Sequence, residues 1–257
     1  MLPIEKVIER AKASGFDAEL AAASTFVKLG FSVNHNVYYI DKDEGKGREF
    51  DIDAHYAAVD CGGTPEVTCR VFLCVEVKRT QEPFIFFSNE MSKVVEGGGG
   101  FSVLHWKKRI DGKLLTYKQL ERKRPFADIK RMARSYSAFK DAREQHIKSA
   151  VLSAFKAALH KKDNINEEYS DVSHDMVIIV PLVVVDGPIY ECFFAESGEL
   201  TAQQVDSVVY LQNYMSESYG SQSVRVVVTT AESLPSVANS YKAWIDDLLQ
   251  AIKSNVD

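Results

Sequence analysis

Two short stretches contain side chains that could bind a metal ion and activate water. Residues 47–54 read GREFDIDA, and residues 72–79 read FLCVEVKR. In the first stretch, polar and apolar residues alternate with a period of two, which is typical of a strand and places Asp51 on a polar face. In the second, Glu76 and Lys78 share one face, roughly 6–7 Å apart along the strand. We therefore expect an acidic strand and a strand that ends in a carboxylate and an ammonium.

These two strands could pair through the turn at 61–65, which reads CGGTP. Gly and Pro in such a cluster are typical of a turn between strands. Pairing would let the ionic ends of the two strands converge on one side of a sheet. Two carboxylates from neighbouring strands, with a lysine beside them, predict a site for a hard divalent cation such as Mg²⁺.

The order of these elements carries a family resemblance. A helix containing Glu19 precedes a strand, then the strand with Asp51, and then the strand that ends in Glu76-Val77-Lys78. This arrangement, over roughly residues 17–80, resembles the PD-(D/E)XK superfamily of restriction-endonuclease-like nucleases. Phe50 stands where many members have a proline.

The resemblance implies hydrolysis of phosphodiester bonds, most simply in DNA, by an endodeoxyribonuclease-like enzyme. It implies that Asp51, Glu76 and Glu19 hold Mg²⁺, for which Mn²⁺ could substitute, and that Lys78 positions or deprotonates the attacking water. The resemblance is also compatible with a homodimer. The alternative is a non-catalytic nucleic-acid-binding or structural module on the same fold. Taken singly, each carboxylate of the sheet is better explained as a solvated charge, with Lys78 pairing with one of them, and Glu19 could equally be a charge that stabilises the first turn of its helix.

Glu49 and Asp53 share the polar face of the first strand with Asp51. All three cannot reach one ion, because alternate residues lie about 6–7 Å apart along a strand. We choose Asp51, which follows a glutamate by two residues, as in the superfamily. Asp53 is then one pleat too far along.

Composition places few limits on function but excludes several classes. The chain has 257 residues, 46% of them hydrophobic, and no apolar run long enough for a membrane span, so we expect a cytoplasmic protein with no membrane contact. The four cysteines lack Cys-x-x-Cys spacing, which favours reduced thiols. There is no Gly-x-Ser-x-Gly and no His-x-x-x-His pair, so serine hydrolases and zinc proteases lack their frameworks.

Positive charge is concentrated in one stretch. Residues 107–134 carry a net charge of +8, whereas the rest of the chain carries −13. Tyr117 and Phe126 lie among these basic residues and could contact sugar or base while the cations hold phosphates. The residues that we expect to bind nucleic acid are Lys107, Lys108, Arg109, Lys118, Arg122, Lys123, Arg124, Lys130, Arg131 and Arg134.

We expect a single α/β domain over residues 1–257, with a mixed central sheet flanked by helices and a restriction-endonuclease-like core. Helices are expected at 3–14 and 17–30, the second capped by Asp17, and strands at 31–40, 49–56 and 71–78. A basic insertion at about 97–125, containing four glycines, precedes a long helical pattern at about 126–162. Further strands and a closing helix fill residues 175–253. A helix between the strand with Glu76 and the strand from Met176 would make those two strands parallel.

Overall fold

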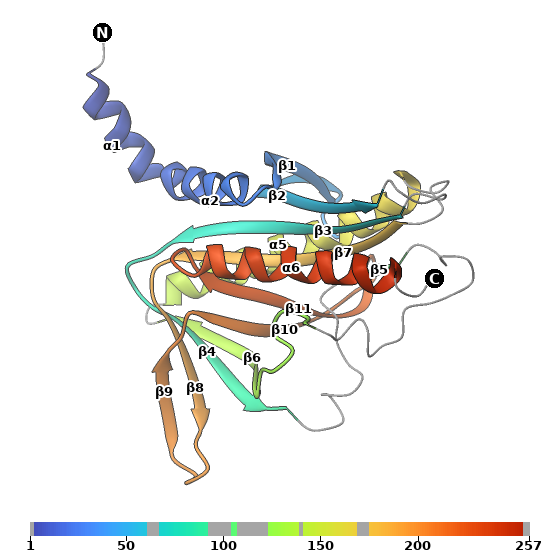
Figure 1. Cartoon of the computed structure of the whole chain (residues 1–257). Coiled ribbons are helices and arrows are strands. Elements are labelled where there is room, and N and C mark those ends of the chain that lie inside the picture. The colour runs from blue at the N-terminus through green and yellow to red at the C-terminus, as the bar shows by residue number, and fades with distance from the viewer. Residues whose placement is uncertain are drawn as a thin grey trace.

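The computed structural model describes residues 3–60, 67–91, 104–106, 123–138, 141–168 and 175–253. Within these ranges the chain is an α/β protein with a large mixed sheet flanked by helices, as expected (Figure 1). The helices are α1 (Ile4–Ser14), α2 (Phe16–Lys28), α5 (Asp141–Glu168) and α6 (Leu234–Lys253). The strands are β1 (Ser32–Asp41), β2 (Lys46–Asp60), β3 (Val67–Arg79), β4 (Phe84–Glu90), β5 (Leu104–Trp106), β6 (Arg131–Ala138), β7 (Asp175–Asp186), β8 (Ile189–Phe194), β9 (Leu200–Gln204), β10 (Ser207–Ser216) and β11 (Gly220–Thr230).

The strands of the described ranges follow the order β1-β2-β3-β7-β11-β10-β6-β4-β8-β9, and β5 adds to β7. Parallel pairs are β3–β7, β7–β11, β10–β6 and β4–β8, and the other pairs are antiparallel. The predicted antiparallel pairing of β2 with β3 and parallel pairing of β3 with β7 are confirmed. Strand β3, which carries Glu76 and Lys78, therefore lies between β2 and β7.

The side chains of β3 alternate between two hydrophobic clusters, one on each face of the sheet. Leu73 and Val75 belong to a cluster with α2 and α6, whereas Phe72 and Cys74 belong to a second cluster with α5. All four are at most 5% exposed. Burial of a large apolar side chain stabilises by roughly 1.5–3 kcal/mol, so this strand is held firmly from both sides.

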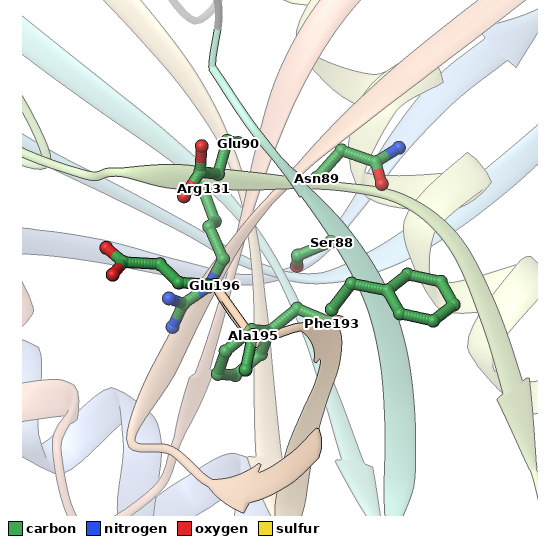
Figure 2. Close-up of a pocket in the computed structure, with 8 residues that line it drawn as sticks. Ser88, Asn89, Glu90, Arg131, Phe193, Ala195 and Glu196 are labelled. Carbon is green, nitrogen blue, oxygen red and sulfur yellow. The ribbon is translucent and has the colours of Figure 1, made fainter. Parts of the chain in front are cut away.

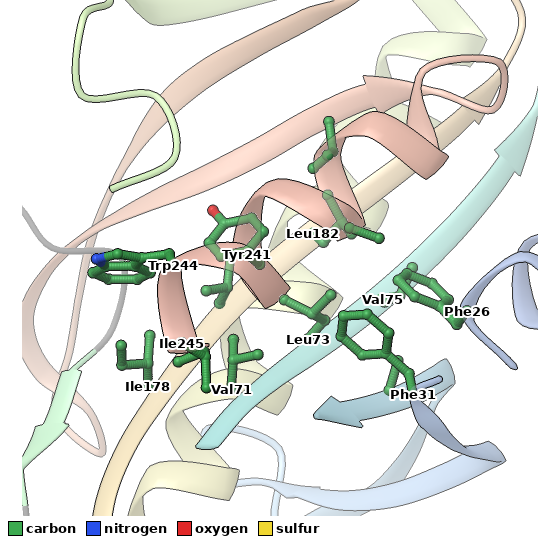
Figure 3. Packing of buried hydrophobic residues seen from close by; sticks show 14 of the residues in the cluster. Phe26, Phe31, Val71, Leu73, Val75, Ile178, Leu182, Tyr241, Trp244 and Ile245 are labelled. Carbon is green, nitrogen blue, oxygen red and sulfur yellow. The ribbon is translucent and has the colours of Figure 1, made fainter. Parts of the chain in front are cut away.

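Helix α6 packs against the first face through its apolar stripe. Tyr241, Trp244 and Ile245 lie over Leu73 and Leu182 of the sheet (Figure 3). These residues recur at helical spacing, which is why the sequence between Leu234 and Lys253 forms an amphipathic helix. Helix α5 packs against the opposite face, on β3 and β7, so β3 has a helix on each side.

A buried ion cluster ties α5 to two hairpins. Lys156 of α5 is 7% exposed, and its Nζ donates to both carboxylate oxygens of Asp41 and to Asp43, each at 2.9 Å. Tyr214 of the β10–β11 hairpin also donates to Asp43, and Tyr219 accepts the backbone N–H of Lys42 at 3.0 Å. The cluster therefore joins the end of the β1–β2 hairpin to α5 and to the β10–β11 hairpin.

The prediction of a long helical segment at about 126–162 was wrong for the residues before Asp141. Residues Arg131–Ala138 form β6, which pairs antiparallel with β4 and meets β10 at Ala133. The helix begins only at Asp141. Apolar residues at 129, 132, 133 and 136 suit a helix locally, but hydrogen bonds to a distant strand outweigh local preference. The glycine run at 97–100 and most of the basic insertion at 97–125 lie outside the described residues.

None of the described helices combines the length and apolar character that crossing a membrane requires. Cys69, Cys74 and Cys192 form no disulfide among the described residues, and the first two are buried. Burial raises the pKa of the Cys74 thiol well above its ordinary value. Cys61 lies outside the described residues.

Candidate active site

The sheet opens between β2 and β3 at Asp51. Pairing of the two strands runs from Asp60–Val67 to Ile52–Val75 and ends there. Beyond this point β2 stays paired with β1, and β3 stays paired with β7 as far as Arg79. The two strands therefore diverge where each presents its ionic residues.

A side chain replaces the missing backbone partner at this opening. Asp51 Oδ2 accepts a hydrogen bond from the backbone N–H of Val77 at 2.7 Å. On the neighbouring strand β1, Asn36 lies opposite Asp51 and has a left-handed φ of 50°. These two residues are left out of the otherwise regular β1–β2 pairing. Asn is one of the few residues that tolerate this region. The local distortion thus coincides with the carboxylate that turns towards β3.

Glu76 and Lys78 form the centre of the site. Glu76 is 4% exposed, and its Oε2 accepts a hydrogen bond from Lys78 Nζ at 2.8 Å. Its Oε1 accepts one from Ser153 Oγ of α5 at 2.5 Å. Both oxygens of this buried carboxylate are therefore satisfied, as a buried charge requires.

Asp51 completes a close triad with these two residues. Lys78 Nζ lies 3.7 Å from Asp51 Oδ2, and both side chains are partly exposed. The ammonium therefore sits between two carboxylates on neighbouring strands. The predicted convergence of Asp51, Glu76 and Lys78 is confirmed as geometry.

Glu19 approaches the triad from α2. It is half-buried, and the charges of Asp51 and Lys78 both act on it. The end of α2 is held there by Arg79, which contacts Asp17 at 2.8 Å, Asp186 at 2.7 Å and the backbone carbonyl of Lys12 at 3.3 Å.

The expected capping role of Asp17 was wrong. Helix α2 begins at Phe16 after Gly15, whose φ of 86° ends α1, and no side chain of the described residues caps it. Asp17 lies within the first turn of α2 and makes an ion pair with Arg79. The Asp17 carboxylate is therefore held by Arg79 at the end of β3 and does not cap the helix.

Burial and neighbouring charges shift the pKa values within the site. Burial raises the pKa of Glu76, Lys78 opposes this, and the Asp51 charge adds to it. Burial likewise raises the pKa of Glu19, with a further rise from Asp51. Burial by itself lowers the pKa of Lys78, but Glu76, Asp51 and Glu19 outweigh it and raise the pKa above its ordinary value. Lys78 is thus a cation at neutral pH.

Three carboxylates and one ammonium give the group a formal charge of −2. Excess negative charge in a partly buried site is unfavourable unless a cation compensates it. Among the described residues, no three acidic, histidine or cysteine side chains lie together as a ready-made metal cluster, and Lys78 Nζ lies between Asp51 and Glu76. Glu19, Asp51 and Glu76 offer carboxylate oxygens, which are the donor type that hard divalent cations prefer.

Asp53 lies one pleat further along β2, as predicted, and has a different partner. It is 3% exposed, and its Oδ2 accepts from Lys161 Nζ of α5 at 2.6 Å. Lys161 also lies 4.5 Å from the centre of the Phe72 ring. Asp53 Oδ1 is buried without a hydrogen-bond partner in the part of the chain that the structure describes. Asp53 therefore belongs to the contact between sheet and α5.

Sequence reasoning missed the contributions of α5. Ser153, Lys156 and His160 follow one another at intervals of three and four residues, so they share one side of the helix. They contact Glu76, Asp41 and Tyr39 respectively. This polar stripe, on the side of α5 that packs against the sheet, was the available signal that the helix faces polar groups there.

The structure places only half of the residues expected to bind nucleic acid. Lys107, Lys108, Arg109, Lys118 and Arg122 lie outside the described residues. Lys123 pairs with Asp247 at 2.6 Å, and Arg131 pairs with Glu191 at 2.8 Å. Arg124 is half-buried, whereas Lys130 and Arg134 are exposed.

A separate pocket of about 380 Å³ lies among β4, β6 and β8. Arg131 enters it from β6, beside Ser88, Asn89 and Glu90 of β4 (Figure 2). The Arg131 guanidinium stacks on the Phe193 ring, 3.6 Å from its centre. Strands β7, β11 and β10 separate this part of the sheet from β3. The pocket is therefore distinct from the carboxylate site.

Comparisons with known proteins add no relative. No protein-family model, no curated protein and no solved structure matches the chain.

Proposed function

We propose that this chain is a metal-dependent nuclease that hydrolyses phosphodiester bonds in DNA, on a restriction-endonuclease-like core. The observation that supports this most directly is the meeting of Asp51, Glu76 and Lys78, with Glu19 beside them, where β2 and β3 diverge. This is the constellation that the sequence resemblance assigns to catalysis.

Glu19, Asp51 and Glu76 would hold Mg²⁺ or Mn²⁺. A divalent cation supplies Lewis-acid stabilisation of the charge that grows on the phosphoryl oxygens and lowers the pKa of bound water. These carboxylates would place the cation at the opening between β2 and β3. Val77 contributes by fixing the orientation of Asp51 through its backbone N–H.

Lys78 supplies a positive charge next to the reacting phosphate. Because its pKa is raised in the described site, it acts there as an ammonium that can orient water and stabilise developing negative charge. Glu76 holds the ammonium at 2.8 Å, and Ser153 holds Glu76. The backbone of DNA would approach the exposed side of Lys78 and Asp51.

A second function follows from the same contacts. Both oxygens of Glu76 are satisfied by Lys78 and Ser153, so the site is partly neutralised by its own residues. Such a site favours a module that binds nucleic acid, or supports another protein, without turnover. This module would bind DNA without cutting it.

The test is cleavage of plasmid, linear and single-stranded DNA in Mg²⁺ or Mn²⁺, with and without EDTA. We expect Asp51→Asn, Glu76→Gln and Lys78→Ala each to lower the rate by about 10²–10³-fold or more. Glu49→Gln is the matched control, because Glu49 lies on the same strand but is exposed. It should keep the wild-type rate.

Cleavage that persists in EDTA, or in all three variants, would contradict a metal-dependent nuclease centred on these residues. Binding of DNA by the wild-type protein with no cleavage under any metal would favour the non-catalytic module. Circular dichroism of each variant separates loss of chemistry from loss of fold.

A further inference from the structure

The first two helices carry an apolar surface that the described part of the chain does not cover. No residue of α1 is buried, and the helix extends away from the body of the protein (Figure 1). The exposed side chains, with their exposed fractions, are Ile4 (73%), Val7 (52%), Ile8 (49%), Phe16 (53%), Leu20 (60%) and Val27 (59%). Exposed apolar patches of this kind mark interaction surfaces.

The apolar residues of α1 form one stripe. Ile4, Val7, Ile8 and Ala11 recur at intervals of three and four residues, which is the pattern of a helix that packs along one face. A single helix of 11 residues is shorter than the roughly 12–15 residues at which isolated helices become stable in water. The stripe therefore calls for a partner that packs on it.

Helix α2 has a second apolar face in addition to its buried one. Ala22 and Phe26 pack into the sheet, whereas Phe16, Leu20 and Val27 lie together on another side and are exposed. Their spacing of four and seven residues keeps them in line along the helix. Two consecutive helices therefore expose apolar residues from Ile4 to Val27.

We propose that α1 and α2 form a self-association surface, in which the α1 helices of two copies of this chain pack antiparallel across a two-fold axis. A two-fold interface uses the same patch on both copies, so the patch must complement itself. Glu5 and Lys12 are seven residues apart and lie on the same side of α1. In an antiparallel pair, Glu5 of one copy meets Lys12 of the other, twice.

The charge of the two helices favours a second copy over a polyanionic surface. Between Ile4 and Lys28 there are four acidic and four basic residues, so the segment has no net charge. Helices that bind anionic membranes have a basic polar face, and nucleic acid likewise attracts cations. A neutral, self-complementary patch with an apolar stripe therefore fits a second copy of this chain better than it fits an anionic membrane or a nucleic acid.

The experiment is sedimentation velocity of the full chain over a range of concentrations. We expect the wild-type protein to dimerise and Val7→Glu/Ile8→Glu to raise the dimer dissociation constant by at least about tenfold, because the charges would be buried at the contact. Leu200→Glu, at a 66% exposed position of β9, is the matched control and should dimerise like the wild type. No buried residue changes in these variants, so the fold should persist.

Charge exchange tests the antiparallel arrangement itself. Glu5→Lys should weaken the dimer, because it places two lysines against each other at both ends of the contact. Glu5→Lys/Lys12→Glu should restore it, because the exchanged charges again meet their opposites. Restoration by the double variant is the result that a non-specific apolar contact would not give.

A wild-type protein that stays monomeric at every concentration would overturn the proposal. A dimer that Leu200→Glu dissociates and Val7→Glu/Ile8→Glu does not would also overturn it, since another surface would then be responsible. If the monomer floats with phosphatidylcholine–phosphatidylserine vesicles and Val7→Glu/Ile8→Glu abolishes flotation, a lipid surface covers the stripe and self-association is wrong.

Discussion

Asp51 Oδ2 accepts the backbone N–H of Val77 at 2.7 Å, at the point where β2 and β3 cease to pair. A carboxylate thus takes the place of a backbone carbonyl at the opening of the sheet. This hydrogen bond fixes the orientation of Asp51 and leaves its side chain partly exposed beside Lys78. The geometry of the site depends on this opening and on helix α5, whose Ser153 contacts Glu76 from one face of the sheet.

The two aspartates of β2 should differ in function. Asp51→Asn keeps an oxygen that can accept from Val77 but removes the charge, so it should abolish Mn²⁺ binding in calorimetry and abolish cleavage. Asp53→Asn should retain a measurable fraction of both, because Asp53 contacts Lys161 and not the triad. The reverse order would place the metal site one pleat further along β2.

Ser153 should position Glu76. Ser153→Ala removes the hydrogen bond to Glu76 Oε1 and should lower metal affinity or cleavage by about 10–100-fold, the usual effect of removing a partner that orients a ligand. Ser149→Ala is the control on the same helix, since the Ser149 hydroxyl donates to the carbonyl of His146 instead. Equal activity of the two variants would show that Ser153 does not orient Glu76.

Lys156 should be essential for stability. Lys156→Met leaves the buried carboxylate of Asp41 without its cation, and we expect a loss of about 3–5 kcal/mol in the free energy of unfolding, measured with urea. Asp41→Asn/Lys156→Met should recover part of this loss. Lys148→Met, at an exposed position of α5, should change little. A small effect of Lys156→Met would mean that water already reaches Asp41.

Acid should weaken the same cluster in a defined pH range. Hydrogen bonds from Ser216, Tyr214 and Lys156 lower the pKa of Asp43 to about 2. The unfolded chain binds this proton near pH 4, so the stabilisation from Asp43 is complete above about pH 4 and is lost as the pH falls towards 2. Urea unfolding of wild type and Asp43→Asn should therefore differ most above pH 4. A difference that does not shrink below pH 4 would contradict this linkage.

The exposed cations of the basic stretch should bind the DNA backbone. Lys130→Glu/Arg134→Glu should weaken DNA binding and flatten its dependence on log salt by roughly one unit for each phosphate that the variant no longer neutralises. Fluorescence anisotropy at several salt concentrations measures the slope. Lys148→Glu is the control outside the stretch. An unchanged slope in the double variant would mean that these two residues face solvent only.

Residue alternation alone predicts the strands that carry the site. Alternation in residues 49–56 and 71–78 predicted both strands, and it placed Glu76 and Lys78 on one face because side chains of a strand alternate strictly. Helical spacing likewise located α1, α2 and α6. The type of each of these helices and strands depends on residues that are close together in the sequence, so the residue pattern is enough to predict it.

Which groups meet in the site depends on contacts between residues that are far apart in the chain. Nothing in the local pattern states that β2 pairs with β3 only from Ile52 onward, which leaves Asp51 at the opening, or that Ser153 reaches Glu76 across 77 positions of sequence. The sequence around Met132 and Tyr136 suits a helix, yet it forms β6. Pairing with β4 supplies hydrogen bonds from a distant part of the chain, which the local residue pattern does not record. Long-range pairing and the burial of charge against α5 separate Asp51 at the opening from Asp53 at the packed contact, although the two aspartates lie two residues apart on the same strand.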